Sequence, residues 1–529
     1  MVPVLTVFGS IFLPSDGVWA HLYSTVLVDY VSNSLILMVG VGICVLVLGI
    51  GPAWLVTMHR FPGRAVLEWA LLLPLAMPAY IIAYTYTGLL DVSGPVQEGL
   101  RQLFGWSYGD YWFPEIRSLG GAVAMLSLVL YPYVYLLSRT AFTEQSVCVL
   151  EVSRTLGCKP RQAFSRVGLP LARPAIIAGL SLALMETLAD YGTVQYFGVS
   201  TFTTGIFRTW FGLGSSSAAA QLSAFLMLFI LILLLLENHS RRRARYHHTS
   251  SRYSRLPRLP LYGWKMAAAL AFCLFPVVFG FLVPATQLLI WATQTWQATA
   301  GRDFYQLITH SLGLAALSSV IAVGLALFVT YGKRLQPNLL SRTAVRILGL
   351  GYAVPGTVIA VGVLIPFTWF DNSIDTWMRQ QFDFSTGLLL SGTLFALVFA
   401  YQVRFLPVSI SSVEAGLTKV KPGMDEVGRS MGYGPAQLLR RVHIPMLRGS
   451  LLTAGLLVFV DVLKELPATL ILRPFNFNTL AVKTYELANE ERLAAAAGPA
   501  LMIVLAGIIP VILLSRTITR SRPGHVQRS

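Results

Sequence analysis

Two pairs of acidic residues with the same spacing fall inside long apolar stretches of the 529-residue sequence. Ionisable side chains in such stretches are costly and usually serve a function. Glu186 and Asp190 are four residues apart, which places both carboxylates on one face of a helix. Asp461 and Glu465 have the same spacing, and Lys464 beside them is a candidate neutralising partner. Such carboxylates could line a pathway for a cation, relay protons, or stabilise the helices around them.

The composition predicts that these acids lie in membrane-spanning helices. The sequence is 55% apolar and only 12% charged, about half the charged fraction of a soluble domain. This composition excludes a disordered chain, and it excludes a soluble nucleic-acid-binding protein in spite of the net charge of +16. Apolar stretches near the length of a membrane span occur at 33–57, 66–90, 119–138, 174–194, 220–237, 266–290, 311–331, 347–369, 386–403, 449–472 and 496–515.

The basic residues predict the orientation of these eleven spans. Most of the 40 Lys and Arg residues fall in alternate loops, above all in 139–173, 238–265 and 404–448. Loops rich in Lys and Arg stay on the cytoplasmic side of a membrane. We therefore assign these loops to the cytoplasm and interpret the chain as an all-α, polytopic membrane protein.

An internal repeat divides the chain into two halves. Residues 151–173 match residues 426–448 at ten of 23 positions, an offset of 275 that also relates the two acid pairs. Pro78 matches Pro355 at an offset of 277, and both prolines are expected to kink helices or to allow non-helical turns. Both loop copies are on the cytoplasmic side, so the halves run parallel, related by an axis along the membrane normal.

The repeat predicts the domain organisation: a first half at 1–237, a basic cytoplasmic linker at 238–265 and a second half at 266–529. Parallel halves need an even number of spans each, which gives about twelve in total. Val2–Pro14 is too short to cross unaided and lacks the basic start and cleavage site of a signal peptide. We interpret Val2–Pro14 as the remains of the first helix, shortened by a truncated or mis-started N-terminus.

The repeated loop reads Glu-x-x-Arg-x-x-Gly-x-x-Pro in both copies. Glu and Arg three residues apart support each other on a short helix, Gly suits its C-terminal turn, and Pro begins a second helix. This pattern predicts a helix–turn–helix along the membrane surface, stiff enough to transmit force; an ordinary amphipathic loop helix is the alternative. The residues are Glu151, Arg154, Gly157 and Pro160, then Glu426, Arg429, Gly432 and Pro435.

This loop resembles the EAA loop of ABC-importer permeases, with Val-Ser and Val-Gly in place of the usual Ala-Ala. Segments such as Glu186-Thr-Leu-Ala-Asp-Tyr-Gly and Lys464-Glu-Leu-Pro-Ala-Thr-Leu are similar to the fused, two-half permeases of the ferric-iron type. The resemblance covers nearly the whole chain. It implies a multi-pass protein of the bacterial inner membrane whose two loops dock on a cytoplasmic ABC ATPase dimer. It also implies a periplasmic substrate-binding protein as a partner.

The resemblance implies ferric iron as the substrate, although permeases for thiamine, phosphonate or polyamine share a similar frame. Fe³⁺ prefers hard oxygen ligands, so the four acids are a candidate translocation path, and no metal site is assigned. The alternative is that these acids stabilise the bundle or contact the binding protein.

The chain has no GxxxxGK[ST] nucleotide-binding motif. We therefore expect it to bind no cofactor and to be no enzyme, with ATP hydrolysed by the partner ATPase. The rival functional class is a secondary transporter driven by an ion gradient, in which paired carboxylates relay protons. A duplicated cytoplasmic loop favours the ATP-driven importer, because a gradient-driven carrier has no need for it.

Overall fold

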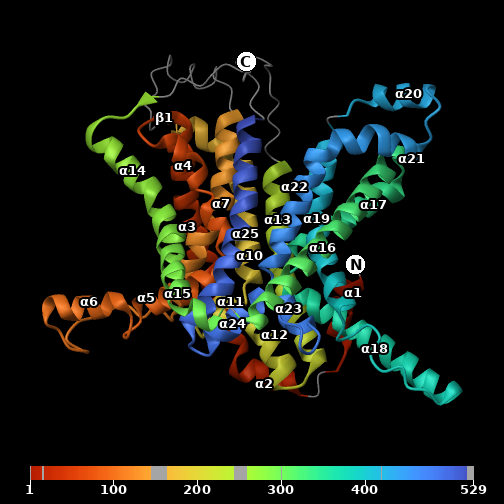
Figure 1. Ribbon diagram of the computed structural model, residues 1–529, viewed down its shortest axis with the longest axis horizontal. Coiled ribbons are helices and arrows are strands. Elements are labelled where there is room, and N and C mark those ends of the chain that lie inside the picture. Colours follow the sequence, from red (N-terminus) through yellow and green to blue (C-terminus); the bar gives the residue numbers. More distant parts are fainter. Residues whose placement is uncertain are drawn as a thin grey trace. The chain divides into compact units, whose positions relative to one another are not determined.

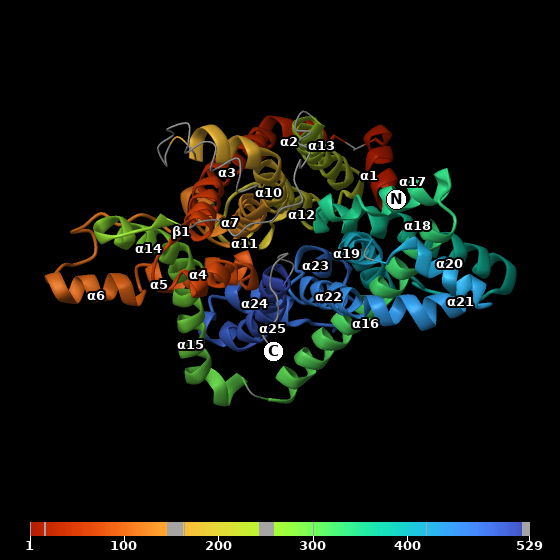
Figure 2. The ribbon, with the colours of Figure 1, turned by 90° about the horizontal axis from the view of Figure 1, so that it is seen from above.

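The computed structural model describes residues 2–14, 17–144, 162, 164–242, 259–299, 301–418 and 420–520. This part of the chain is almost entirely helical (Figures 1 and 2). The two short strands found in it, β1 (His59–Arg60) and β2 (Leu259–Pro260), pair in parallel. The all-α fold predicted from composition is confirmed.

Ten helical segments in the described residues are long and apolar enough to cross a membrane. An eleventh candidate is the pair Arg64–Ala76 and Ala79–Phe104, which is bent by 92°. The eleven predicted spans therefore correspond to ten continuous segments and one broken one. The continuous segments are Leu27–Met58, Leu119–Thr143, Phe164–Ala189, Ser216–Glu237, Gly263–Gln297, Arg302–Leu335, Gly356–Phe382, Leu394–Leu417, Pro435–Leu463 and Leu493–Ile512.

The chain forms two compact units, each assembled from separate stretches of sequence. The first, here called the α16 unit, comprises Met1–His21, Gly205–Met227 and Gln297–Glu486. The second, the α3 unit, comprises Leu22–Thr204, Leu228–Trp296 and Leu487–Ser529. The compact units are defined by contacts between residues, whereas the predicted halves are defined by sequence similarity between two segments. The units thus do not test the halves. The division into halves at 237 and 266 therefore stays a prediction.

The α3 unit contains the broken span and most of the first-half helices. Its central helices α3, α7 and α10 lie side by side. The helices mainly within it are α3 (Leu27–Met58), α4 (Arg64–Ala70), η2 (Leu73–Ala76), α5 (Ala79–Leu90), α6 (Pro95–Phe104), α7 (Leu119–Glu144), η3 (Phe164–Gly168), α10 (Leu169–Ala189), α11 (Gly192–Tyr196), α14 (Gly263–Val277), η5 (Val278–Leu282), α15 (Val283–Thr299) and α25 (Leu493–Arg520).

Glycines allow these three helices to approach closely. A Cβ atom at Gly49 of α3 would lie 2.7 Å from the Cβ of Val134 on α7. A Cβ atom at Gly179 of α10 would lie 2.8 Å from the Cα of the same valine. Small residues at helix contacts are typical of membrane bundles, where close van der Waals packing replaces the hydrophobic effect.

The α16 unit contains the second repeated loop. Its helices α16, α19 and α22 pack against one another, with α20 and α21 at one end of them (Figure 1). The helices mainly within it are α1 (Val2–Gly9), η1 (Ser10–Phe12), α16 (Arg302–Leu335), α17 (Leu339–Leu348), η6 (Gly351–Ala353), α18 (Gly356–Phe382), α19 (Leu394–Leu417), α20 (Pro422–Ser430), α21 (Pro435–Leu438), η7 (Leu439–His443), α22 (Ile444–Leu463), α23 (Pro467–Leu472) and α24 (Leu480–Asn489).

Three of the remaining helices have residues in both units: α2 (Val18–Thr25), α12 (Phe202–Phe207) and α13 (Ser216–Arg242). The short η4 (Arg208–Gly212) lies in the α16 unit. The N-terminal apolar segment forms α1 and η1, too short for a span, and α1 packs on α18. The interpretation of Val2–Pro14 as a shortened first helix stays a prediction.

Several predicted spans differ from the structure in their boundaries; the span predicted at 449–472, for example, is observed as Pro435–Leu463. The segment predicted at 347–369 is divided, because α17 ends at Leu348 and α18 begins at Gly356, after Pro355. The segment predicted at 386–403 is α19, which runs from Leu394 to Leu417. Arg404, assigned to a cytoplasmic loop from the sequence, therefore lies inside a helix.

Candidate coupling loops and intramembrane charges

The first repeated loop lies outside the described residues. Glu151, Arg154, Gly157 and Pro160 all fall in 145–161, so their predicted roles stay predictions.

The second repeated loop has the helix–turn–helix form expected from its sequence. Glu426 and Arg429 lie on α20, and Pro435 is the first residue of α21. Gly432 has a φ of 81°, which a residue with a side chain rarely adopts. The Tyr433 amide donates to the Gly428 carbonyl across this turn at 3.0 Å, the hydrogen bond of a Schellman motif.

An apolar groove runs along this helix–turn–helix. Its volume is about 410 Å³, and Met424, Val427 and Met431 are among the residues that line it. These three side chains are 41%, 59% and 62% exposed. Exposed methionines adapt to varied partner surfaces, and an exposed apolar patch marks an interaction site. The groove is therefore suited to bind an apolar surface of another protein.

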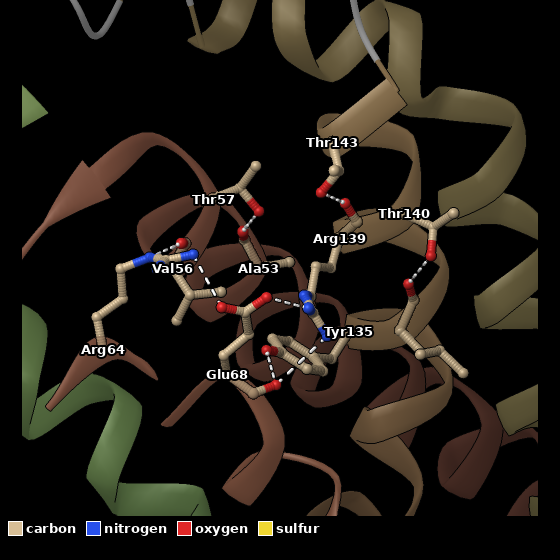
Figure 3. Close-up of polar contacts among 10 residues, drawn as sticks. Ala53, Val56, Thr57, Arg64, Glu68, Tyr135, Arg139, Thr140 and Thr143 are labelled. Atoms are coloured by element: carbon tan, nitrogen blue, oxygen red, sulfur yellow. Dashed lines mark hydrogen bonds and ion pairs between the residues drawn. The ribbon is translucent and has the colours of Figure 1, made fainter. Parts of the chain in front are cut away.

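A buried charge cluster lies in the α3 unit near the C-terminal end of α7 (Figure 3). Glu68 of α4 forms ion pairs with Arg64, at 2.9 Å, and with Arg139 of α7. The Tyr135 hydroxyl also donates to the Glu68 carbonyl at 2.9 Å. Arg139 is only 3% exposed and lies six residues before the undescribed segment that begins at 145. This cluster fixes the end of α7 on α4.

The role of Glu68 was not predictable from the sequence. This residue lies near the start of the predicted span 66–90, and the only local signal is Arg64 four residues earlier. Its partner Arg139 is 71 residues away, too far for helical spacing to connect the two.

The acid pair of the first half lies at the end of α10. Asp190 follows the last residue of α10, and one of its carboxylate oxygens accepts from the amides of Thr193 and Val194, both at 3.1 Å. The other accepts from the Thr193 hydroxyl at 3.0 Å. Asp190 therefore caps the N-terminus of α11, where unpaired N–H groups favour a carboxylate. Glu186 lies one turn earlier on α10.

The acid pair of the second half has a similar arrangement in the α16 unit. The Glu465 carboxylate accepts from the amides of Ala468 and Thr469, both at 3.0 Å, and so caps α23. It also accepts from Arg404 of α19 at 3.3 Å. Asp461 pairs with Lys464 at 2.8 Å, as expected from their spacing. Arg404 was missed as a partner because the sequence analysis placed it in a loop.

A glycine provides the space for the Arg404–Glu465 pair. A Cβ atom at Gly356 would lie 2.3 Å from an Arg404 guanidinium nitrogen and 2.6 Å from Glu465 Oε1. Asp190 and Glu465 thus each have a hydrogen-bonding role within their own unit. Among the described residues, no group of three His, Cys, Asp or Glu side chains is arranged to hold a metal ion. The role of the four acids in translocation stays a prediction.

Comparisons with known proteins agree with the resemblance in the repeated loops. Residues 45–246 match the family described as the binding-protein-dependent transport system inner membrane component. The chain is 27% identical over 493 residues to the Fe(3+)-transport system permease protein FbpB 2 of Haemophilus influenzae, a match that covers 92% of this chain and 90% of that protein.

Two shorter matches are to permeases for other substrates. The sulfate transport system permease protein CysT of Salmonella typhimurium is 33% identical over 150 residues, 28% of this chain and 51% of that protein. The molybdenum transport system permease protein ModB of Haemophilus influenzae is 29% identical over 150 residues, 28% of this chain and 62% of that protein. With its apolar helices, the chain is a multi-pass protein of the bacterial inner membrane, and over residues 45–246 it is similar to the inner-membrane components of binding-protein-dependent transport systems.

Proposed function

We propose that this permease imports ferric iron and that a separate cytoplasmic ABC ATPase drives it. The similarity to FbpB 2 along 92% of the chain is the observation that carries the iron assignment. The sulfate and molybdenum permeases match only 28% of it. Thiamine, phosphonate and polyamine remain the alternative substrates.

The second repeated loop supports coupling to an ATPase. It is a helix–turn–helix with a left-handed turn at Gly432 and an exposed apolar groove, which suits docking of α20 on a partner protein. The first loop repeats the same sequence pattern, so one chain offers two docking elements to the two subunits of an ATPase dimer. Closure of that dimer on ATP then pulls both loops, and the membrane helices alternate access between the two sides.

The four acids have a limited part in this proposal. Asp190 and Glu465 hold the short helices α11 and α23 in place through backbone amides. A transport path should bind its ion weakly. The carboxylates of Asp190 and Glu465 already accept hydrogen bonds from backbone amides, and Glu465 also accepts one from Arg404, so they would bind a passing ion only weakly. Selection of iron then falls to the periplasmic binding protein, which delivers the substrate.

The substrate proposal is tested by uptake with competitors. Cells that produce the chain with its ATPase and binding protein should accumulate radioactive ferric iron. Excess unlabelled ferric iron should reduce that accumulation, while sulfate, molybdate, thiamine, a phosphonate or a polyamine should leave it unchanged. Cells that produce the ATPase and binding protein without this chain are the control. Uptake of one of the competitors in place of iron would overturn the assignment.

A further inference from the structure

Two side chains at the end of α16 contact both ends of the second loop. Tyr331 and Arg334 are three residues apart and so share a helix face. The Tyr331 hydroxyl donates to the carbonyl of Pro435, where α21 begins, at 2.9 Å. Arg334 donates from its two terminal nitrogens to the carbonyls of Leu417 and Val420, at 2.8 and 2.9 Å. One turn of α16 therefore holds the start and the end of the loop.

Arg334 also contacts the coupling helix itself. Its Nε donates to Asp425 Oδ2 at 2.8 Å, and Asp425 lies on α20. The two side chains are 19% and 12% exposed, so solvent screens this pair less than it screens a surface ion pair. A planar guanidinium can bind three acceptors at once, which an ammonium group cannot do in the same geometry.

Asp425 links α20 to the helix after the loop as well. His443 Nε2 lies 2.9 Å from Asp425 Oδ1, and the imidazole is fully buried. The His443 ring also packs on Tyr331, with 5.2 Å between ring centroids. His443 ends η7, which continues directly into α22. The Asp425 carboxylate thus joins the coupling helix to α16 through an ion pair and places it in contact with His443 at the start of α22.

The first half lacks all three ionisable members of this connection. At the repeat offsets of 277 before the loop and 275 after it, Arg334 corresponds to Thr57, Asp425 to Leu150 and His443 to Gly168. Thr57 donates its hydroxyl to the Ala53 carbonyl of its own helix, at 2.7 Å.

The structure supports this correspondence independently. Trp54 stands where the second half has Tyr331, and a Cβ atom at Gly168 would lie 2.6 Å from the Trp54 ring. In the second half, the smaller Tyr331 ring packs on the larger His443 side chain. In both halves an aromatic ring therefore packs against this position, a large ring against glycine in the first half and a smaller ring against histidine in the second. Only the second half adds charges to it.

We propose that Arg334 is a positioning residue that fixes the second coupling helix to α16 and α22, and that the two loops are therefore mechanically unequal. Force on α20 moves two membrane helices through the Arg334–Asp425–His443 connection. At the corresponding positions the first half carries the uncharged residues Thr57, Leu150 and Gly168. This inference rests on the proposed coupling to an ATPase.

Arg334→Met tests the inference in proteoliposomes that contain the chain with its ATPase and binding protein. The variant should still bind the ATPase and hydrolyse ATP, because α20 keeps its exposed groove. Substrate transported per ATP should fall about tenfold, the order expected for the loss of a charge-assisted hydrogen bond. Arg334→Lys should recover part of this ratio, because it keeps the charge and loses the planar fork.

Matched controls come from the same helix and from the other half. Lys333→Met removes an ion pair to Glu414 that is more than one third exposed and contributes little. Thr57→Val changes the equivalent first-half position. Both variants should keep the wild-type transport per ATP.

The outcomes separate the two proposals. If the wild-type chain binds no ATPase, the proposed function is wrong. If the wild type couples and Arg334→Met keeps the same transport per ATP, the inference is wrong and the function stands. An equal fall in the two control variants would also overturn the inference. Should Arg334→Met fail to fold, Asp425→Asn takes its place, because it keeps the side-chain size. Transport per ATP should again fall about tenfold, and unchanged transport per ATP would again overturn the inference.

Discussion

At the scale of single residues, charges in this protein are held by partners far away in the sequence. Glu465 was identifiable from the sequence because it interrupts an apolar stretch, but its partner Arg404 was not. A hydropathy pattern ends a span at the first arginine. The helix instead continues through Arg404 to Leu417, and Glu465 compensates the charge of Arg404. The same long-range pairing explains why Glu68 and Arg139 were missed.

The Glu68–Arg139 pair gives a prediction at this scale. Glu68→Met leaves Arg139 buried without a carboxylate and should lower the free energy of unfolding by about 3–5 kcal/mol. Glu68→Met with Arg139→Met should recover most of this loss, because the unpaired charge is gone. Thermal unfolding of the purified protein in detergent measures both variants.

Tyr135→Phe is the control for this pair, since it removes only one hydroxyl bond to the Glu68 carbonyl. It should cost about 1 kcal/mol. A double variant that is less stable than Glu68→Met alone would show that the ion pair is not the source of the loss.

At the scale of helices, the sequence predicted where elements occur better than how they are joined. Pro78 and Pro355 were expected to break helices, and both precede the start of a new one, α5 and α18. The bend within 66–90 lies at Pro78, where a kink or turn was expected, but its angle of 92° was not predictable, since hydropathy measures length and composition and contains no direction. The helix–turn–helix of the second loop was predictable because caps and turns depend on neighbouring residues.

The exposed groove of α20 gives a prediction at the scale of this element. Val427→Asp places a charge on the apolar groove at a position that is 59% exposed. The fold should be unaffected, while recovery of the ATPase with the purified chain should fall at least tenfold, because binding would bury an unpaired carboxylate.

Leu103→Asp on α6 is the matched control for Val427→Asp. It makes the same kind of change at a position that is 77% exposed and outside the loop, so it should leave ATPase recovery unchanged. Equal recovery with Val427→Asp and with the wild type would show that α20 is not the docking element.

At the scale of the whole chain, the repeat was visible in the sequence and the packing was not. The offset of 275 matched Asp190 to Glu465, and both turn out to cap a short helix. The compact units, however, join α14, α15 and α25 to first-half helices. Sequence similarity records which segments share an origin, whereas packing depends on contacts between segments far apart in the chain.

The central claim is that ATP hydrolysis by a partner drives ferric-iron import through this chain. Proteoliposomes with the chain, its ATPase and its binding protein measure this directly, with radioactive ferric iron and a proton ionophore. The account predicts uptake that requires ATP and persists when the ionophore removes the proton gradient. Uptake that occurs without the ATPase and is abolished by the ionophore would contradict ATP-driven import. It would identify the chain as a gradient-driven carrier.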